Sequence, residues 1–478
     1  MCNEVGSEYR LFPRNLDQAK MMLAPLNLAP QTPAAVNIPT YPEFAPAEDV
    51  PWIEEEQREM LRLLDREPLV SLSRFLQRKA KESVLPASAW RPATMRKLLI
   101  DEDKAELLLH SVPKILLRGL AMGILGWQAR LHPPHPLAIS QPIYADDGPG
   151  TYVATMGILG RDGRGPSANE WVTVCEKIEA YIEASEVLDR TPPAQRTAAM
   201  NKLVLDARRI DRIYAHSDSG SRLAFVGHIK SASNETDKWR VLIRTLRGFR
   251  DKAPDPDKPL LQTPSYVGCA RDSIVHRSSS HCPQKGYQKG NEGWWLTMSC
   301  LMDMGLVPDV HIVHAVRIWE PDQLPMSEVL MTVVARSELG SWGFNFMVPG
   351  STTAVKVPNP ARDVMGVWFH RHYLEEQLRE SREGLDRAIR AVTEIPKLIT
   401  EIRELQWETL SLTQRVAEAE AELTVFDEDY IENEVRLNRE AIESMEMIND
   451  DLEDCLRLFD ALQVEGEDEE DGGDAASS

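Results

Sequence analysis

The side chains best suited to catalysis lie between residues 266 and 345. In chain order they are Tyr266, Arg277, His281, Glu328 and Asn345. Cleavage of a phosphodiester needs a polarised nucleophile, compensation of charge on the phosphoryl oxygens and help for the leaving group. A phenol, a guanidinium, an imidazole and a carboxylate can supply these functions together. The residue types are therefore compatible with phosphoryl chemistry, provided that folding brings them into one site.

In order and spacing this set resembles the GIY-YIG endonuclease superfamily. In that family a strand ending in Tyr-Ile-Gly leads into a helix with a catalytic Arg, and a His commonly follows four residues later. A helical Glu that binds one divalent metal and an Asn before a Gly-Ser-like turn come next. Here Tyr-Val-Gly at 266–268 is followed by Arg277 and His281 at that spacing, and then by Glu328 and Asn345. The resemblance covers under a third of the chain.

The resemblance implies a role for each residue. Glu328 would hold Mg²⁺ or Mn²⁺ as a hard oxygen ligand, with most of the other sites left to water and phosphate. Arg277 would pair with the scissile phosphate, because its planar fork suits two oxygens. Tyr266 would orient or deprotonate the attacking water with support from His281. Asn345 would be structural and would bond the backbone near the site.

The first motif of the family, Gly-Ile-Tyr, is not found at its usual place about ten residues before the second. One alternative puts the first strand at 223–225, where Phe225 lacks the hydroxyl. The other pairs 212–214 with 225–227, but no Arg/His/Glu series follows it in place, so the first alternative is preferred. Either way one motif tyrosine is missing. The chain is thus predicted to be a metal-dependent endonuclease or a catalytically weakened, nucleic-acid-binding descendant of one.

A basic segment precedes and includes part of this set. Residues 220–290 contain 13 basic and 6 acidic side chains. Basic residues at mostly helical spacing form a basic stripe: Lys238, Arg240, Arg244, Arg247 and Arg250. The basic stripe could bind the phosphates of DNA or RNA, and the alternative is a solvated helix face.

The net charge of −21 comes almost entirely from the C-terminal part of the chain. Residues 373–478 contain 32 acidic and 10 basic side chains, and the remainder is close to neutral. The acidic part would repel a polyanion, whereas the basic segment is compatible with one. Charge therefore does not exclude nucleic acid.

The N-terminal half is expected to be helical. Residues 1–51 contain eight prolines and predict a disordered leader. Residues 52–215 predict a helical module, with a loop-rich stretch from Gly148 to Gly165 that contains short strand-like pieces. Apolar periodicity predicts its helices at about 52–64, 69–82, 93–109, 112–130, 168–187 and 194–213.

Residues 220–360 are expected to be the GIY-YIG-like domain, a small mixed α/β unit. Strands are predicted at 223–229, 265–269 and 309–318, and helices at about 291–305 and 325–338. Trp294 and Trp295 could stack on bases, but the favoured interpretation packs one of them in the core with the other flanking it. With the flanking helices this gives an α+β fold class.

Residues 371–462 predict a long coiled-coil-type helical arm. Apolar residues interrupted by Asn recur by threes and fours from Ile431, and Leu398, Leu405 and Leu412 recur by sevens after Pro396, which is expected to start a helix. The arm is either a hairpin folded back on its own domain or a dimerisation coiled coil, and 426–429 is either a turn or a seam defect. Residues 463–478 predict an acidic disordered tail.

The remaining features narrow the class of protein. No apolar run is long enough for a membrane span and no secretory signal is visible. Six widely spaced cysteines favour reduced thiols, so a nuclear or cytoplasmic location is expected, and no histidine or cysteine group has zinc-finger spacing. Self-association or a protein partner through 371–462 is expected. The rival function is a non-enzymatic coiled-coil interaction or scaffold protein.

Overall fold

The computed structural model describes residues 52–82, 90–131, 148–215, 222–225, 233–282, 291–320, 322–347, 349–350, 360–422 and 428–467. The leader 1–51 and the tail beyond 467 lie outside them. The chain divides into two units, Met1–Arg382 and Glu383–Ser478. None of the described helices is both long and apolar enough to cross a membrane. Helices around a small antiparallel sheet confirm the α+β class.

The sheet has three antiparallel strands, with β1 (Gly150–Ile158) between β2 (Ser265–Ala270) and β3 (Pro308–Arg317). Every residue of β1 is buried. The strand lies in the loop-rich stretch from Gly148 to Gly165, where short strand-like pieces were expected, and the structure has one continuous strand of nine residues there. A strand covered on both faces has no alternation of polar and apolar residues, which removes the usual sequence signal.

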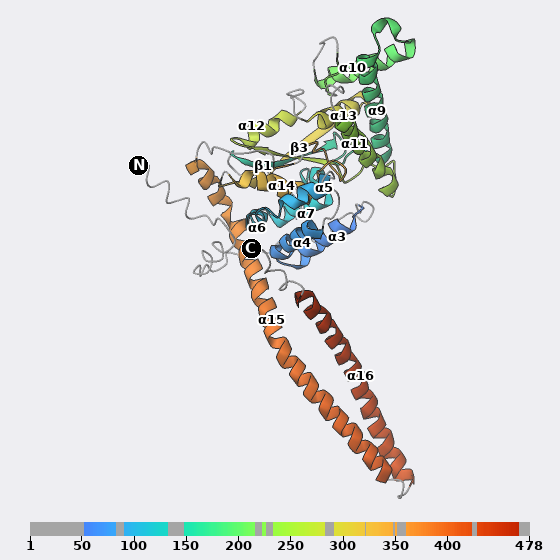
Figure 1. Cartoon of the computed structure of the whole chain (residues 1–478), viewed down its shortest axis with the longest axis vertical. Coiled ribbons are helices and arrows are strands. Elements are labelled where there is room, and N and C mark those ends of the chain that lie inside the picture. Colours follow the sequence, from blue (N-terminus) through green and yellow to red (C-terminus); the bar gives the residue numbers. More distant parts are fainter. Residues whose placement is uncertain are drawn as a thin grey trace, which may run out of the picture. The chain divides into compact units, whose positions relative to one another are not determined.

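One face of the sheet packs on a helical layer, and Val153 of β1 points into it. This layer lies on one side of the sheet in Figure 1. It consists of α3 (Glu55–Arg66), α4 (Leu69–Glu82), α5 (Trp90–Lys97), α6 (Glu102–His110), α7 (Lys114–Met122), α8 (Leu125–Gln128) and α14 (Gln323–Ala335).

The opposite face carries a second layer, and Ala154 and Met156 of β1 point into it. It consists of α9 (Ala168–Arg190), α10 (Ala198–Tyr214), α11 (Ser233–Lys252) and α13 (Glu292–Asp303). The first three of these helices lie in the sequence between β1 and β2. The two paired strands are therefore separated by a long helical insertion that covers one face of their own sheet.

Several predicted boundaries differ from the structure. The helix expected at 93–109 is divided into α5 and α6, because Asp101 caps α6 by accepting a hydrogen bond from the Lys104 amide. The helix expected at 112–130 ends early at Gly123, which has a φ of 72° that favours glycine. Residues 223–225 are irregular instead of forming a strand, and 226–229 lie outside the described residues.

The C-terminal helices are α15 (Pro360–Glu422) and α16 (Glu428–Glu467). In the second unit, residues 405–412 of α15 and 445–452 of α16 line the same groove, and Figure 1 shows the two helices antiparallel. The predicted seam residues of α16 are half-buried: Ile431, Val435, Ile442, Met445, Leu452 and Leu456. Pro396 lies inside α15, not at its start. The predicted row of Leu398, Leu405 and Leu412 is exposed, while Ile395, Ile399 and Ile402 are half-buried.

Candidate functional site

The site begins with two tyrosines on neighbouring strands. Tyr152 of β1 lies opposite Gly268 of β2, and Tyr266 lies two residues before that glycine. The ring centroids of the tyrosines are 6.4 Å apart. A Cβ atom at position 268 would lie 2.6 Å from the Tyr152 hydroxyl oxygen. The glycine of the Tyr-Val-Gly motif therefore leaves room for the second phenol.

His281 joins the two tyrosines from a turn that follows the short helix α12 (Ile274–Ser278). Its Nε2 atom lies 2.8 Å from the Tyr152 hydroxyl oxygen, and its ring centroid is 4.7 Å from that of Tyr266. The imidazole is 3% exposed. Its Nδ1 atom is buried with no hydrogen-bond partner among the described residues, so the ring keeps a polar atom available at the site.

Burial sets the protonation states of this aromatic group. It lowers the pKa of His281 to about 3, with the positive charge of Arg277 acting in the same direction. Burial likewise raises the pKa of Tyr152 and of Tyr266. Around neutral pH all three side chains are uncharged, so this aromatic group contains no fixed charge of its own.

Arg277 supplies the positive charge of the site. It lies on α12 and is exposed, and its guanidinium has no hydrogen-bond or ion-pair partner within the described part of the chain. Its charge lowers the pKa of Tyr152 and Tyr266, although burial outweighs that effect. An exposed guanidinium beside two phenols is suited to an anionic ligand.

Glu328 supplies the carboxylate, from α14 on the opposite face of the sheet. Its Oε2 atom accepts hydrogen bonds from the backbone amide of Gly350 at 3.0 Å and from the thiol of Cys269 at 3.4 Å. Burial raises its pKa, and the Gly350 amide, the Cys269 thiol and the charge of Lys97 oppose this. Its negative charge in turn raises the pKa of Tyr266. The site thus extends around β2, an edge strand of the described sheet.

Asn345 holds the edge strand in place. Its Oδ1 atom accepts a hydrogen bond from the Val267 amide at 2.9 Å, and its Nδ2 atom donates one to the Val267 carbonyl at 2.7 Å. The side chain is buried and both bonds lie next to Tyr266. Asn345 therefore bonds the backbone beside the site without entering it.

The structure brings His281 onto Tyr266 and bonds Glu328 and Asn345 to other residues of β2. Arg277 is linked to the tyrosines only through its charge, and one further residue was missed. The phenol beside Tyr266 belongs to Tyr152, in Gly150-Thr151-Tyr152, more than a hundred residues upstream. The two alternatives considered for the missing motif lie elsewhere: Phe225 packs on Tyr181, and Tyr214 packs on Trp295. The sequence signal for Tyr152 is the Gly-X-Tyr pattern at 150–152, taken without a limit on its distance from Tyr266.

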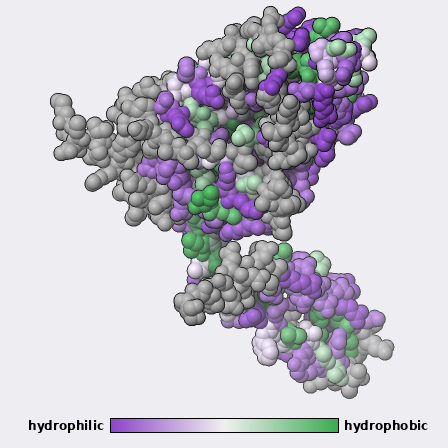
Figure 2. All heavy atoms as spheres, turned by 45° about the horizontal axis from the view of Figure 1, so that its top comes forward, coloured by the Kyte–Doolittle hydropathy of each residue, from purple (hydrophilic) through white to green (hydrophobic). Residues whose placement is uncertain are grey.

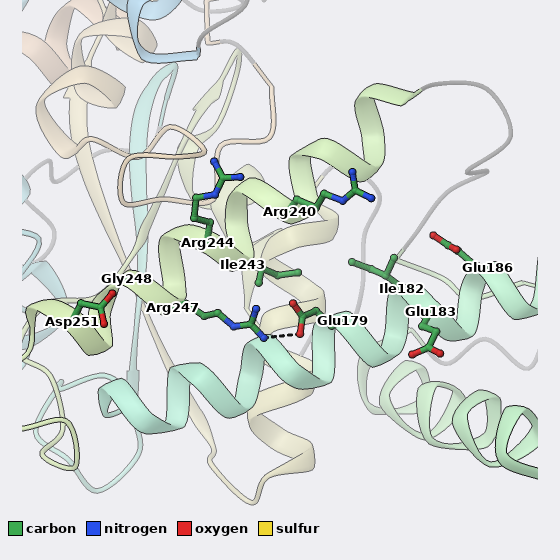
Figure 3. A pocket seen from close by; sticks show the side chains of 10 residues that line it. All are labelled: Glu179, Ile182, Glu183, Glu186, Arg240, Ile243, Arg244, Arg247, Gly248 and Asp251. Carbon is green, nitrogen blue, oxygen red and sulfur yellow. Dashed lines mark hydrogen bonds and ion pairs between the residues drawn. The ribbon is translucent and has the colours of Figure 1, made fainter.

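The basic stripe lies apart from this site, on α11. The helix packs on α9 through buried residues that include Trp239, Leu242 and Phe249. Figure 3 shows Arg240, Arg244 and Arg247 on one side of a hollow of about 650 Å³, with acids of α9 on the other. These acids are Glu179, Glu183 and Glu186. Arg247 forms an ion pair with Glu179 at 2.6 Å, so acidic side chains offset much of the positive charge in the hollow.

Other candidate groups do not form sites within the described residues. Trp294 and Trp295 are both buried in the core, whereas only one of them was expected there. No group of three or more His, Cys, Asp or Glu side chains that could hold a metal ion occurs in the described part of the chain.

Comparisons with known proteins return no match: no family model, no curated protein and no solved structure matches this chain.

Proposed function

We propose that the chain is a metal-dependent endonuclease of the GIY-YIG type, acting on DNA or RNA at Tyr152, Tyr266, Arg277, His281 and Glu328. The observation that carries the proposal is the pair of tyrosines. Gly150-Thr151-Tyr152 and Tyr266-Val267-Gly268 lie on neighbouring antiparallel strands, which supplies the Gly-Ile-Tyr-like motif that had no counterpart in the sequence near residue 266. With both phenols at hand, the weakened-descendant interpretation loses its main support.

The charged groups suit a phosphodiester. Arg277 is exposed and would form charge-assisted hydrogen bonds to the phosphoryl oxygens. Glu328 lies on the opposite face of the sheet, and its negative charge raises the pKa of Tyr266 across the edge strand β2. A substrate phosphate bound by Arg277 would lie on the face of the sheet that carries Tyr266.

Glu328 is also the proposed ligand of Mg²⁺ or Mn²⁺, and its surroundings fit a single cation. Its Oε2 atom accepts two hydrogen bonds, while no hydrogen bond to its Oε1 atom is present among the described residues. Within the described residues no group of three or more His, Cys, Asp or Glu side chains forms a metal cage, so an ion would take most of its ligands from water and phosphate, as Mg²⁺ commonly does. Such an ion would neutralise negative charge on the phosphate.

Tyr152, Tyr266 and His281 would handle the attacking water and its proton. Tyr266 is the more exposed phenol and would orient the water. Tyr152 would accept a proton from that water while donating its own to Nε2 of His281, since the two atoms are already 2.8 Å apart. As the water oxygen bonds to phosphorus, the bond from phosphorus to the leaving oxygen breaks, and that oxygen takes a proton from solvent. The imidazole is uncharged beforehand because its pKa is about 3, and the negative charge of a bound phosphate would raise that pKa.

A nicking assay on supercoiled DNA and on labelled RNA tests the proposal. The wild type should cleave with Mg²⁺ or Mn²⁺, and Glu328→Ala should lose that cleavage. Glu404→Ala, an exposed acid of α15, is the matched control and should cleave like the wild type. Equal cleavage by wild type and Glu328→Ala, or cleavage by neither, would contradict the endonuclease proposal.

The hairpin of α15 and α16 favours a second role beside catalysis, namely binding to another protein. Large apolar side chains are exposed along both helices of the second unit, among the hydrophilic residues that Figure 2 colours purple. Such a surface is typical of an interaction site.

A further inference from the structure

An apolar groove runs between the two helices of the hairpin. It has a volume of about 260 Å³. The groove residues are Leu405, Gln406, Glu408, Thr409 and Leu412 of α15 and Met445, Ile448, Asn449 and Leu452 of α16. Leu405 is 56% exposed and Ile448 is 57% exposed, so part of the apolar lining stays exposed although Met445 and Leu452 are half-buried.

The apolar lining continues beyond the groove. Leu398 precedes Leu405 by seven residues, which places it two turns earlier on the same side of α15, and it is 53% exposed. From Leu398 to Leu412 the row is about 21 Å long at 1.5 Å per residue. That length matches roughly four turns of a docked helix with apolar residues at a spacing of three and four.

The flanks of the groove are acidic. Residues 398–415 and 441–456 together contain nine acidic and two basic side chains. A second copy of the same hairpin would bring two such negative surfaces together, and it would have to overcome their repulsion. A helix with basic flanks would instead complement the charge on both sides of the apolar row.

From the apolar lining, its length and the charge of its flanks we infer that this groove binds a basic amphipathic helix of a partner protein. The apolar face of the partner helix covers Leu398, Leu405, Leu412 and Ile448, while its Lys and Arg side chains pair with the acids on either flank. This inference does not depend on the proposed nuclease activity.

Three synthetic 18-residue peptides with a fluorescent label test the inference by fluorescence anisotropy with the full chain. The first has a leucine face flanked by Lys and Arg. The second keeps the leucines but carries Glu at the basic positions, and the third keeps the basic residues but carries Ser at the leucine positions. Only the first should bind saturably, and its affinity should fall about tenfold between 50 and 300 mM salt, because the flanking ion pairs are exposed to solvent.

Two double variants place the binding in the groove. Leu405→Ser/Ile448→Ser should weaken binding of the first peptide about tenfold or more through loss of apolar contact. Val392→Ser/Leu410→Ser changes exposed residues of α15 that do not line the groove and should change the affinity less than twofold. Circular dichroism checks that both variants stay helical. If the first pair unfolds, the comparison of the three peptides on the wild type still decides the outcome.

Three results would overturn the inference. The first is no binding of the basic amphipathic peptide, or equal binding of the acidic or the serine peptide. The second is equal weakening by both double variants. The third is a dimer in sedimentation equilibrium that Leu405→Ser/Ile448→Ser dissociates and the peptide does not, which would assign the groove to a second copy of the chain.

Discussion

The Tyr152 hydroxyl oxygen lies 2.8 Å from Nε2 of His281, across a buried contact that joins residues 129 positions apart in the sequence. Neither group carries a charge around neutral pH, because burial raises the pKa of Tyr152 and lowers that of His281 to about 3. The contact fixes the phenol next to Tyr266, which is the arrangement on which the proposed chemistry depends.

Tyr152→Phe is therefore expected to lower the rate of phosphodiester cleavage by about 100-fold, a typical contribution of a general acid-base group. Loss of one buried hydrogen bond should lower the free energy of unfolding by only about 1 kcal/mol. Cleavage assays and urea unfolding measure the two effects separately. Tyr214→Phe is the matched control, because the Tyr214 ring packs on Trp295 and not on the other tyrosines or His281. Full cleavage by Tyr152→Phe would remove Tyr152 from the mechanism.

More of the residues of this site than of the strands in the sheet could be predicted from the sequence. Arg277 and His281 lie on one turn of chain, so their spacing alone placed them together. Tyr152 could not be placed in the same way, because its partner strand follows only after α9, α10 and α11. Strands that are neighbours in a sheet are usually close in sequence. The strand with the Gly-Ile-Tyr motif was therefore expected among the residues shortly before Tyr266.

The hairpin illustrates a different limit of sequence analysis. The apolar periodicity of α16 identified its half-buried seam from Ile431 onward. In α15 two apolar rows compete, one through Ile395, Ile399 and Ile402 and one through Leu398 and Leu405. Periodicity shows that both rows are apolar, and only the packing of α16 decides which row becomes the seam.

Glu328→Gln should lower cleavage on the order of 10²–10³-fold, as expected when a group that stabilises the transition-state charge is lost. The carboxylate must be deprotonated to hold a cation, and burial raises its pKa above 4.5. Cleavage by the wild type should therefore rise with pH through that raised pKa. Mn²⁺ binding followed by electron paramagnetic resonance provides a readout that does not depend on activity. Unchanged Mn²⁺ affinity in Glu328→Gln would show that the ion binds elsewhere.

Cys269→Ala should move the acidic limb of the pH–rate profile to higher pH. The Cys269 thiol donates a hydrogen bond to Oε2 of Glu328 and lowers the pKa of that carboxyl. Without the donor the carboxylate form is less favoured, so a higher pH is needed to deprotonate it. Cys269→Ser keeps a donor and should shift the profile less. Cys455→Ser, an exposed cysteine of α16, is the control. A profile that Cys269→Ala leaves unchanged would contradict a positioning role for the thiol.

Glu54→Gln should destabilise the first unit at neutral pH but not in acid. Burial raises the pKa of Glu54. The hydrogen bonds and charges of Lys252 and Arg336 lower that pKa by a larger amount, so its net value is about 2. Because this pKa lies below the ordinary glutamate value of 4.5, the ion pairs stabilise the fold above pH 4.5, and their contribution is lost as the pH falls toward 2. Glu54 is partly exposed, so we expect about 1 kcal/mol at pH 7 after allowance for solvent screening.

Urea unfolding of the wild type and Glu54→Gln at pH 7, 4 and 3 measures this difference. The difference in free energy of unfolding between the wild type and Glu54→Gln should decrease as the pH falls. Glu55→Gln changes the next residue, which is exposed at the start of α3, and should match the wild type throughout. A gap that stays constant with pH would mean that Glu54 acts by packing and not through its charge.

Arg240→Gln/Arg244→Gln should weaken the binding of DNA less than threefold, whereas Arg277→Gln alone should weaken it more. Arg240 and Arg244 share their hollow with Glu179, Glu183 and Glu186, so a phosphate backbone entering there would meet repulsion as well as attraction. Arg277 has no such acids paired with it in the described part of the chain.

Each phosphate contact contributes about 0.9 to the slope of log affinity against log salt. Titrations between 50 and 200 mM salt should therefore show a lower slope for Arg277→Gln and an unchanged slope for the double variant. The reverse pattern would assign the main nucleic-acid contact to α11, and Glu183→Gln/Glu186→Gln should then strengthen binding by removing the opposing charge.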